Sequence, residues 1–139
     1  LEESNIVIPG GAELEISHHY GIEKFQQYGL TMITVVNRGY CKKLLIVLPG
    51  QTHPEQYHKL KEETFHVLHG VSSAASDVYK RQKPGDVINI EPGVRHAFGT
   101  DEGCIIEEIS STHYTDDSFY TDEAISLNKN RKTVIRYWI

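Results

Sequence analysis

The segment from Gly50 to Gly70 reads GQTHPEQYHKLKEETFHVLHG and places imidazole, amide and carboxylate side chains between two glycines. Three of these side chains, on Gln56, His58 and Glu63, carry atoms that can bind a divalent first-row metal. Because Gln56 and His58 are two residues apart, they point to the same face of an extended strand. Glu63 follows a polar stretch that can turn the chain before the next β-prone run. The segment therefore predicts one half of a metal site.

Two alternatives apply to the same segment. His58 and Glu63 could be solvated groups on an exposed hairpin, where most isolated residues of these types lie. His53 could serve as a ligand in place of Gln56, because a neutral amide binds metals more weakly than imidazole does. His53 ranks lower, since its spacing of three residues from Gln56 puts the two on opposite faces of a fully extended strand.

A second group of turn residues lies between Gly85 and His96. Lysine, proline, glycine and aspartate at 83–86 predict a turn, and the run 87–90 predicts a strand. A further Pro-Gly turn then leads to His96, which becomes another ligand candidate. With two such clusters along the chain, a shared site is the preferred interpretation.

Length and composition fit one domain over residues 1–139, with a barrel core at 29–110. A net charge of -5 and a pI near 5.9 give no basic patch, so nucleic acid is not an expected partner. No apolar run approaches the ~20 residues of a membrane span, so we expect a cytoplasmic protein. Cys41 and Cys104 are expected to be buried thiols. Since the chain begins at Leu1, we expect a piece of a longer protein.

Short β-prone runs between Gly/Pro turns, with almost no helix, predict an all-β sandwich or barrel. One short helix is expected near the N-terminus, at 22–28, before the stop signal of Gly29. The expected strands are 6–8 and 13–16 as an opening hairpin, 30–36 and 42–48 as a second one, 64–68, 87–90, 104–110, and 133–139 as a closing strand that packs Trp138. On the strand 104–110, Ile106 and Glu108 share one face, so a carboxylate must face inward or lie at the barrel mouth.

Two stretches fit this scheme less well. His18 and His19 are adjacent and point in different directions on a regular element, so we expect surface or loop histidines. Residues 71–82, VSSAASDVYKRQ, lack alternating apolar residues where a second hairpin arm is expected. This anomalous segment is similar to translated adapter sequence, and a flexible loop tip is the alternative. We expect residues 71–82 to form the least well ordered edge of the domain.

The two clusters resemble the two cupin motifs. The first motif, G-x5-H-x-H-x4-E-x6-G, is matched except that Gln56 replaces its first histidine. The second, G-x5-P-x-G-x2-H-x3-N, is matched at Gly85, Gly93 and His96, with proline displaced by one position and Thr100 in place of asparagine. The resemblance implies a cupin, a double-stranded β-helix or jelly-roll barrel. Cupins often form homodimers, which we also expect here.

Within the cupins, the phrases YCKKLLIVLPGQTHPEQYH, KEETF, EPGVRHAF and EEISSTHYTDDSFYTD resemble the D-lyxose isomerase family of sugar ketol-isomerases. This resemblance, over about Tyr40 to Asp122, implies a divalent metal ion, with manganese favoured over iron, nickel or zinc. By residue, it implies the metal ligands Gln56, His58, Glu63 and His96 and the proton-transfer residues Lys61 and Glu108. For Lys61, an exposed lysine in the charged run KLKEE is the alternative.

Such an enzyme would move a carbonyl between C1 and C2 of a sugar or sugar phosphate. The metal would stabilise the enediolate as a Lewis acid, and Glu108 would act as the base. The N-terminal stretch NIVIPGGAELEISHHYGIEKFQQYG also resembles the cupin domain appended to sialic acid (nonulosonate) synthases. A sugar-binding or regulatory module of such a synthase is therefore one alternative, and a metal-free structural or dimerisation cupin is another.

Overall fold

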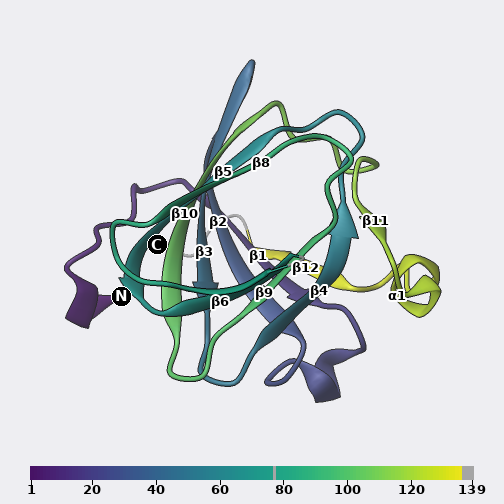
Figure 1. Cartoon of the computed structure of the whole chain (residues 1–139). Helices are drawn as coiled ribbons and strands as arrows, with labels where there is room; N and C mark the ends of the chain where they lie inside the picture. Colours follow the sequence, from purple (N-terminus) through teal and green to yellow (C-terminus); the bar gives the residue numbers. More distant parts are fainter. Residues whose placement is uncertain (77, 136–139) are drawn as a thin grey trace.

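The computed structural model describes residues 1–76 and 78–135 and shows two antiparallel β-sheets facing each other (Figure 1). The strands are β1 (Glu13–His18), β2 (Gly29–Asn37), β3 (Tyr40–Val47), β4 (Thr52–Tyr57), β5 (Glu63–Gly70), β6 (Ser72–Ser76), β7 (Val78–Gln82), β8 (Val87–Ile90), β9 (His96–Gly99), β10 (Cys104–Ser111), β11 (Phe119–Tyr120) and β12 (Lys132–Ile135). The helical elements are the 3-10 turns η1 (Glu2–Ser4) and η2 (Ile22–Lys24) and the helix α1 (Glu123–Leu127). No helix among the described residues is long and apolar enough to cross a membrane.

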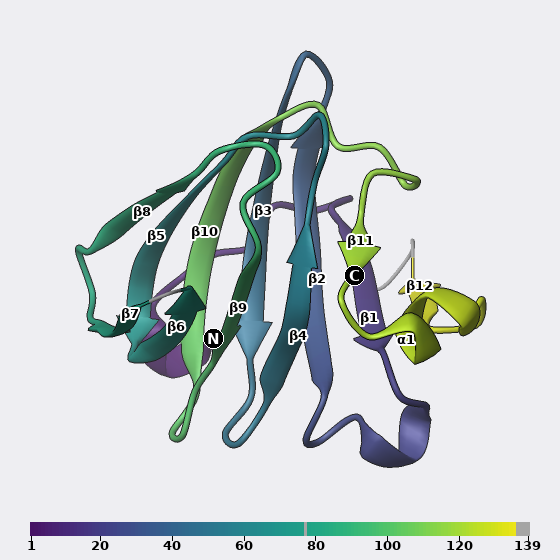
Figure 2. The ribbon, with the colours of Figure 1, turned by 45° about the vertical axis from the view of Figure 1, so that its right-hand side comes forward.

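The larger sheet has the strand order β12-β1-β2-β3-β10-β5-β8, and the smaller one the order β11-β4-β9-β6-β7. Figure 2 shows β4, β9 and β6 of the smaller sheet lying across from the middle of the larger one. Each predicted metal-site segment thus spans both layers. The first contributes β4 to the smaller sheet and β5 to the larger, and the second contributes β8 to the larger sheet and leads into β9 of the smaller. The space between the layers is where their inward side chains meet.

Apolar side chains fill one end of that space. Leu45, Phe65, Phe98 and Ile106 come from both sheets and belong to the main core cluster. The predicted alternation on β10 is confirmed, because Ile106 and Glu108 are buried while Ile109 is exposed. Cys41 and Cys104 are buried free thiols, as expected. The other end of the space is polar, and there the candidate ligands lie.

The N-terminal segment differs from the predicted hairpin. Residues 6–8 form no strand, and β1 pairs instead with β2 and β12. Ile6 and Ile8 pack against a second apolar cluster around Ile33 and Leu44 on the outer face of the larger sheet. Their apolar character, which suggested a strand, serves this packing. The helix predicted at 22–28 is present but shorter, because it consists of the single 3-10 turn η2. The α-helix lies near the C-terminus instead, as α1.

The strands β6 and β7 form a hairpin where a loop was expected. β6 pairs antiparallel with β7 over five residue pairs, from Ser72↔Gln82 to Ser76↔Val78, and β6 also pairs with β9. The small residues at 72–75 carry no apolar alternation, so the sequence pattern alone gave no strand signal. At the other end of the chain, β12 covers the described part of the predicted closing strand, and it lies at the edge of the larger sheet. The prediction for Trp138 falls outside the described residues.

Candidate active site

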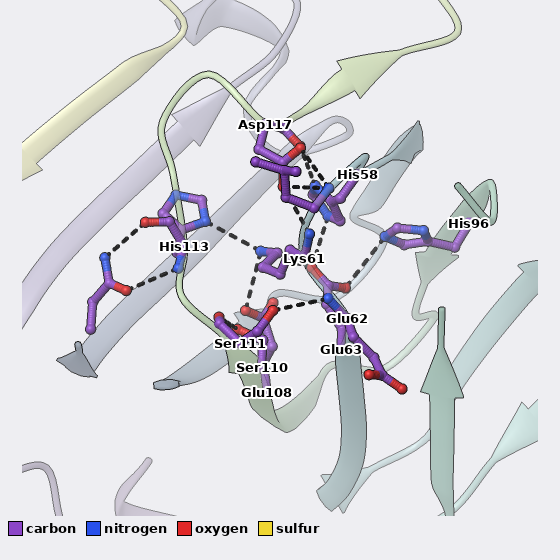
Figure 3. Close-up of polar contacts among 12 residues, drawn as sticks. His58, Lys61, Glu62, Glu63, His96, Glu108, Ser110, Ser111, His113 and Asp117 are labelled. Carbon is purple, nitrogen blue, oxygen red and sulfur yellow. Dashed lines mark hydrogen bonds and ion pairs between the residues drawn. The ribbon is translucent and has the colours of Figure 1, made fainter. Parts of the chain in front are cut away.

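The two sequence clusters meet in one buried group of side chains. His58 follows β4, Glu63 begins β5 and His96 begins β9, and one ligand atom from each lies within 4.8 Å of the other two. All three side chains are buried, with 1 to 4% of their surface exposed. Figure 3 shows His58 and His96 approaching Glu63 from different sides. The convergence that the spacing predicted is present, and the alternative of solvated groups on a hairpin is wrong.

The polar atoms of this group fit a metal ion. Nε2 of His58, Nε2 of His96 and Oε2 of Glu63 are buried and have no hydrogen-bond partner among the described residues. The approach of His58 Nε2 to Glu63 Oε1, at 2.8 Å, lacks the direction of a hydrogen bond. Leaving such atoms unsatisfied is unfavourable. Two imidazoles and a carboxylate are a donor set suited to divalent transition metals.

Each histidine is oriented by a backbone carbonyl. Nδ1 of His58 donates to the carbonyl oxygen of Asp117 at 2.7 Å, and Nδ1 of His96 donates to that of Val94 at 3.0 Å. A neutral imidazole that donates from Nδ1 keeps the lone pair on Nε2, which is the atom that faces the cluster. A hydrogen bond from the other ring nitrogen to a carbonyl oxygen is typical of histidines that bind metals.

Asp117 also holds the segment between two of the candidate residues. Its buried carboxylate accepts hydrogen bonds from the backbone N–H groups of Lys59, Leu60 and Lys61 at 2.9 to 3.3 Å. Together with the bond to His58, these contacts fix the turn that delivers both His58 and Lys61 to the site. Asp117 could not be found from the sequence, because an aspartate in a polar, turn-rich stretch carries no signal that distinguishes it from exposed neighbours.

Lys61 lies at the centre of a charged network. Its Nζ is 2.8 Å from Glu63 Oε1, 3.5 Å from Glu108 Oε2 and 3.2 Å from Nδ1 of His113 (Figure 3). Only 4% of Lys61 is exposed, so the alternative of a solvated lysine is wrong. His113 was not singled out from the sequence. The side chain of Asn37 fixes it by bonds to both its backbone N–H and its carbonyl oxygen.

The charged groups in this network shift one another's pKa values. Burial would raise the pKa of Glu63, but its contacts with His58 and Lys61 outweigh this effect and lower it. Burial raises the pKa of Glu108, the nearby charge of Glu63 adds to the rise, and Lys61 and Lys43 oppose it. Burial would lower the pKa of Lys61, but the charges of Glu108 and Glu63 raise it. The site therefore holds one ionised glutamate, one glutamate that binds its proton more tightly, and a protonated lysine between them.

Gln56 and His53 both line the cavity beside the cluster. The register of β4 against β9 shifts between His53 and Gln56, so a bulge places both side chains inward. The reason for ranking His53 below Gln56 was therefore wrong. His53 stacks on Phe98 with ring centroids 4.8 Å apart, and its Nδ1 bonds to the carbonyl oxygen of Pro54. A metal-ligating role for Gln56 stays a prediction.

His18 and His19 are buried and not surface residues, so that expectation was also wrong. His19 packs edge-on against His53, with ring centroids 4.9 Å apart, and its Nδ1 bonds to the carbonyl oxygen of Tyr28. Burial, with nearby cations, lowers the pKa of His19 to about 4 despite this bond. A neutral His19 thus supports the wall of the cavity from behind His53.

The backbone requires glycine at two positions of the cupin motifs. Gly93 has a φ of 83°, and its N–H donates to the carbonyl oxygen of His58 at 2.6 Å, which ties the second cluster to the first. Gly70 has a φ of 74°, and a Cβ there would collide with the backbone carbonyl of Gly103. Both positions therefore require glycine for the two segments to reach their observed places.

A small cavity opens beside the cluster between the two sheets. Its walls combine the apolar side chains of Leu45, Phe65 and Phe98 with polar ones. The polar lining residues are Ser17, Lys43, His53, Gln56, His58, Lys61, Glu63, Glu108, His113, Ser118, Tyr120 and Lys132. A lining rich in hydrogen-bonding groups suits a polyhydroxylated ligand.

The sequence matches characterised sugar isomerases along most of its length. It is 29% identical to the D-lyxose/D-mannose isomerase of Thermosediminibacter oceani, over 90% of this chain and 86% of that protein. It is 30% identical to the D-lyxose ketol-isomerase of Cohnella laeviribosi, over 76% of this chain and 75% of that protein. The chain belongs to the D-lyxose isomerase family. No protein-family model matches the sequence.

The fold of this D-lyxose isomerase family member recurs in solved structures. The L-ribose isomerase of Cellulomonas parahominis with L-psicose superimposes with a TM-score of 0.71 at 14% identity, over 91% of this chain and 88% of that one. A double-stranded β-helix protein from Klebsiella pneumoniae superimposes with a TM-score of 0.60 at 16% identity, over 67% and 85%. The predicted cupin fold is confirmed. These matches give no support to the resemblance to sialic acid synthases.

Proposed function

We propose that this protein is a metal-dependent aldose–ketose isomerase that acts on sugars of the D-lyxose and D-mannose type. The observation that carries the proposal is the buried group His58, Glu63 and His96 beside the ion-paired Lys61 and Glu108. Family membership supports the same reaction, since the named relatives isomerise D-lyxose or D-mannose. A metal-free structural cupin is not favoured, because it would leave several polar atoms of this group buried without partners.

His58, Glu63 and His96 would hold the ion, and Gln56 is the candidate for a fourth ligand. Manganese is our first expectation, with iron, nickel or zinc as alternatives that the same nitrogen and oxygen donors accept. When bound, the ion would supply Lewis acidity toward the carbonyl oxygen and the neighbouring hydroxyl of the sugar. The two carbonyl-oriented imidazoles would present Nε2 to it without rearrangement.

Glu108 is the candidate base for the proton that moves between the two carbons. Its Oε2 is buried, has no hydrogen-bond partner among the described residues and lies at the wall of the cavity. As a base it would take the proton from C2 of the aldose, which leaves an enediolate, and return it to C1. The proton of the C2 hydroxyl would pass to O1, which completes the ketose. Burial raises the pKa of Glu108, and a base is most effective when its pKa approaches the working pH.

Lys61 would stabilise the negative charge that develops on the sugar oxygen. The charges of Glu108 and Glu63 raise its pKa, against the effect of burial, so that it stays a cation. A fixed cation in a site that excludes water stabilises developing charge more strongly than solvent does. Its Nζ already lies between the two glutamates, and a sugar oxygen at this point would be close to both the base and the cation.

The direct test combines metal content with turnover. Protein purified without chelator is analysed for bound metals and then assayed for conversion of D-lyxose and D-mannose to ketoses. We expect near-stoichiometric metal and turnover, with both lost in His58→Ala. His69→Ala is the matched control, because His69 is exposed on β5, and it should keep both. Wild-type protein that neither contains nor takes up a divalent metal would overturn the proposal.

A further inference from the structure

His113 is a cavity residue that the reaction proposed above does not use. It lies in the loop between β10 and β11, and its side chain lines the cavity together with Lys61. Its backbone is fixed at both polar groups, because Asn37 Oδ1 accepts from its N–H at 3.0 Å and Asn37 Nδ2 donates to its carbonyl oxygen at 3.1 Å. Asn37 ends β2, so the loop is tied to the β2–β3 hairpin. This attachment holds the imidazole at one part of the cavity wall.

The contact with Lys61 decides which ring nitrogen of His113 carries the proton. Nζ of Lys61 lies 3.2 Å from Nδ1 of His113. Burial would lower the pKa of Lys61, but the charges of Glu108 and Glu63 raise it, so its amine is a cation that can only donate. Nδ1 of His113 therefore accepts, and the proton of the neutral ring lies on Nε2. Burial, with Lys43 and Lys61 nearby, lowers the pKa of His113 to about 2, which keeps the ring neutral.

The same contact fixes the direction of the Lys61 amine. Its Nζ donates to Glu63 Oε1 at 2.8 Å and to His113 Nδ1 at 3.2 Å. An ammonium group has three N–H donors, so one is left for the more distant Glu108 or for a sugar oxygen. His113 thus acts on the proposed reaction first by holding the cation that faces the developing charge.

The Nε2–H group of His113 is a donor without an acceptor. This nitrogen has no hydrogen-bond partner among the described residues, and the residue is half-buried. The lysines that line the cavity near it, Lys43, Lys61 and Lys132, are donors as well. A donor in the wall of a polar cavity is satisfied by water or by a ligand oxygen. The oxygen of a sugar hydroxyl fits this requirement.

The place of Lys61 indicates which sugar hydroxyl this is. Figure 3 shows Lys61 between His113 on one side and His96 of the candidate metal site on the other. In the proposed reaction O1 and O2 of the sugar lie on the metal side, and C2 lies near Glu108. The next hydroxyl along the sugar, on C3, then lies on the side of Lys61 where His113 is.

We propose that His113 is a specificity-determining residue, which holds Lys61 through Nδ1 and donates a hydrogen bond from Nε2 to the C3 hydroxyl of the sugar. The inference rests on the proposed isomerase function and names the group that selects the configuration at C3. D-lyxose and D-mannose, the sugars proposed above, have the same configuration at this carbon. One neutral ring would orient both the cation and the carbon next to the reacting pair.

The test compares sugars that differ at a single carbon. D-arabinose differs from D-lyxose only at C3, and D-xylose differs from D-lyxose only at C2. The manganese-loaded full chain is assayed for kcat/KM on all three. We expect the wild type to prefer D-lyxose over D-arabinose by about tenfold or more, because a site that bonds a hydroxyl group discriminates against a sugar that misplaces it. Equal kcat/KM for D-lyxose and D-arabinose would overturn the proposal.

Two substitutions separate the two nitrogens of His113. In His113→Asn the amide oxygen can replace Nδ1 as the acceptor for Lys61, but nothing replaces the Nε2 donor. In His113→Gln the longer side chain can place an amide N–H near the position of Nε2. We expect His113→Asn to lose about tenfold of the preference at C3 and to keep the preference at C2, and His113→Gln to restore most of the preference at C3. A loss in His113→Asn by the same factor on all three sugars would indicate a purely structural role and overturn the proposal.

His66→Asn is the matched control for these variants. His66 lies on β5, its side chain is 39% exposed, and it faces Glu107 and not the cavity. Its substitution should leave kcat/KM and both preferences at wild-type values.

Binding measurements keep this inference separate from the proposed function. D-lyxose and D-arabinose are titrated calorimetrically into manganese-loaded Glu108→Gln, which lacks the candidate base, with and without His113→Asn. Turnover of D-lyxose by the wild type with an unchanged preference at C3 in His113→Asn would leave the isomerase function standing and exclude the contact. Tighter binding of D-lyxose that depends on His113, without turnover by the wild type, would support the contact and exclude the isomerase function. Equal binding of both sugars without any turnover would overturn both.

Discussion

The carbonyl oxygen of Asp117 lies 2.7 Å from Nδ1 of His58, while the carboxylate of the same aspartate binds the backbone of the three residues that follow His58. One side chain and its own carbonyl thus hold a metal-ligand candidate and the turn that leads to Lys61. Asp117 is 59 residues from His58 in the sequence, so the loop before β11 completes the site that β4 and β5 begin.

Asp117→Asn should weaken both the turn and the metal site. The amide would place an N–H₂ group against the backbone N–H donors of Leu60 and Lys61, where the carboxylate oxygen now accepts. Loss of these charge-assisted bonds should lower the free energy of unfolding by about 2 kcal/mol. Metal affinity should fall by about 10- to 100-fold, as for other changes to groups that orient ligands. Urea denaturation and competition with a metal chelator measure the two effects.

Asp116→Asn provides the control for this variant. Asp116 precedes Asp117 and is exposed, so its substitution should leave both measurements at wild-type values. If Asp117→Asn bound metal as tightly as the wild type, the orienting role of its loop would be refuted.

Glu108→Gln should separate catalysis from metal binding. Its Oε2 is 3.5 Å from Lys61 Nζ, and Glu108 is not one of the three clustered ligand candidates. An amide cannot accept the C2 proton, so kcat for the aldose should drop by about 10²- to 10⁴-fold. Metal content should stay at the wild-type level. Steady-state kinetics and elemental analysis of the same preparation check both statements.

The adjacent Glu107 is the matched control for Glu108. It points to the other face of β10, where it pairs with Lys42 at 3.2 Å outside the cavity. Glu107→Gln should therefore keep kcat within about twofold of the wild type, since exposed ion pairs contribute little. Equal activity of Glu107→Gln and Glu108→Gln would show that Glu108 is not the base.

Gln56→His should restore the full first cupin motif. Gln56 lies on β4 directly opposite His96 on β9 and lines the cavity, so a histidine here would add an imidazole near the cluster. Imidazole is a stronger ligand than an amide oxygen, and manganese affinity should rise by about tenfold, or about 1.4 kcal/mol. Chelator competition measures the change.

Gln56→Ala completes that comparison. If the amide oxygen of Gln56 is a ligand in the wild type, its removal should weaken manganese binding. Unchanged affinity in both Gln56 variants would show that position 56 does not contribute to the metal site.

The sequence predicted the site better than it predicted the edges of the fold. His58, Glu63 and His96 could be found because each follows or begins a strand at a fixed distance from a turn glycine, and that spacing survives folding. The burial of Lys61 was not predictable in this way. A KLKEE run is ordinarily exposed, and only the distant Asp117 and Glu108 show that this turn is buried.

Other predictions from the sequence were wrong because of contacts between distant parts of the chain. The strand bulge between His53 and Gln56 changed which side chains face inward, and alternation alone assumes a regular strand. Ile6 and Ile8 have β-prone side chains that pack on the outer face of the sheet without pairing. The small residues of β6 form a strand because they pair with the edge of β9. Each of these outcomes depends on a tertiary partner that the local pattern does not contain.

The buried His19 predicts how stability should respond to pH. Burial lowers its pKa from 6.5 to about 4 in the folded protein, whereas the unfolded chain has the ordinary value. As the pH falls from 6.5 to 4, the unfolded state binds a proton at this position and the folded state does not. The contribution of His19 to stability is therefore complete above pH 6.5 and decreases with acidification, by about 1.4 kcal/mol per pH unit.

His19→Asn should remove this part of the acid sensitivity, and the asparagine amide can still donate to the carbonyl oxygen of Tyr28. Urea denaturation of the metal-free protein between pH 7 and pH 4.5 gives the free energy of unfolding for each variant. Because other buried histidines add to the wild-type slope, the relevant quantity is the difference between the two curves, which should shrink or reverse toward low pH. His69→Asn, at an exposed position on β5, should give a curve parallel to the wild type. A His19→Asn curve that also runs parallel would show that His19 takes up its proton equally well in the folded and unfolded states.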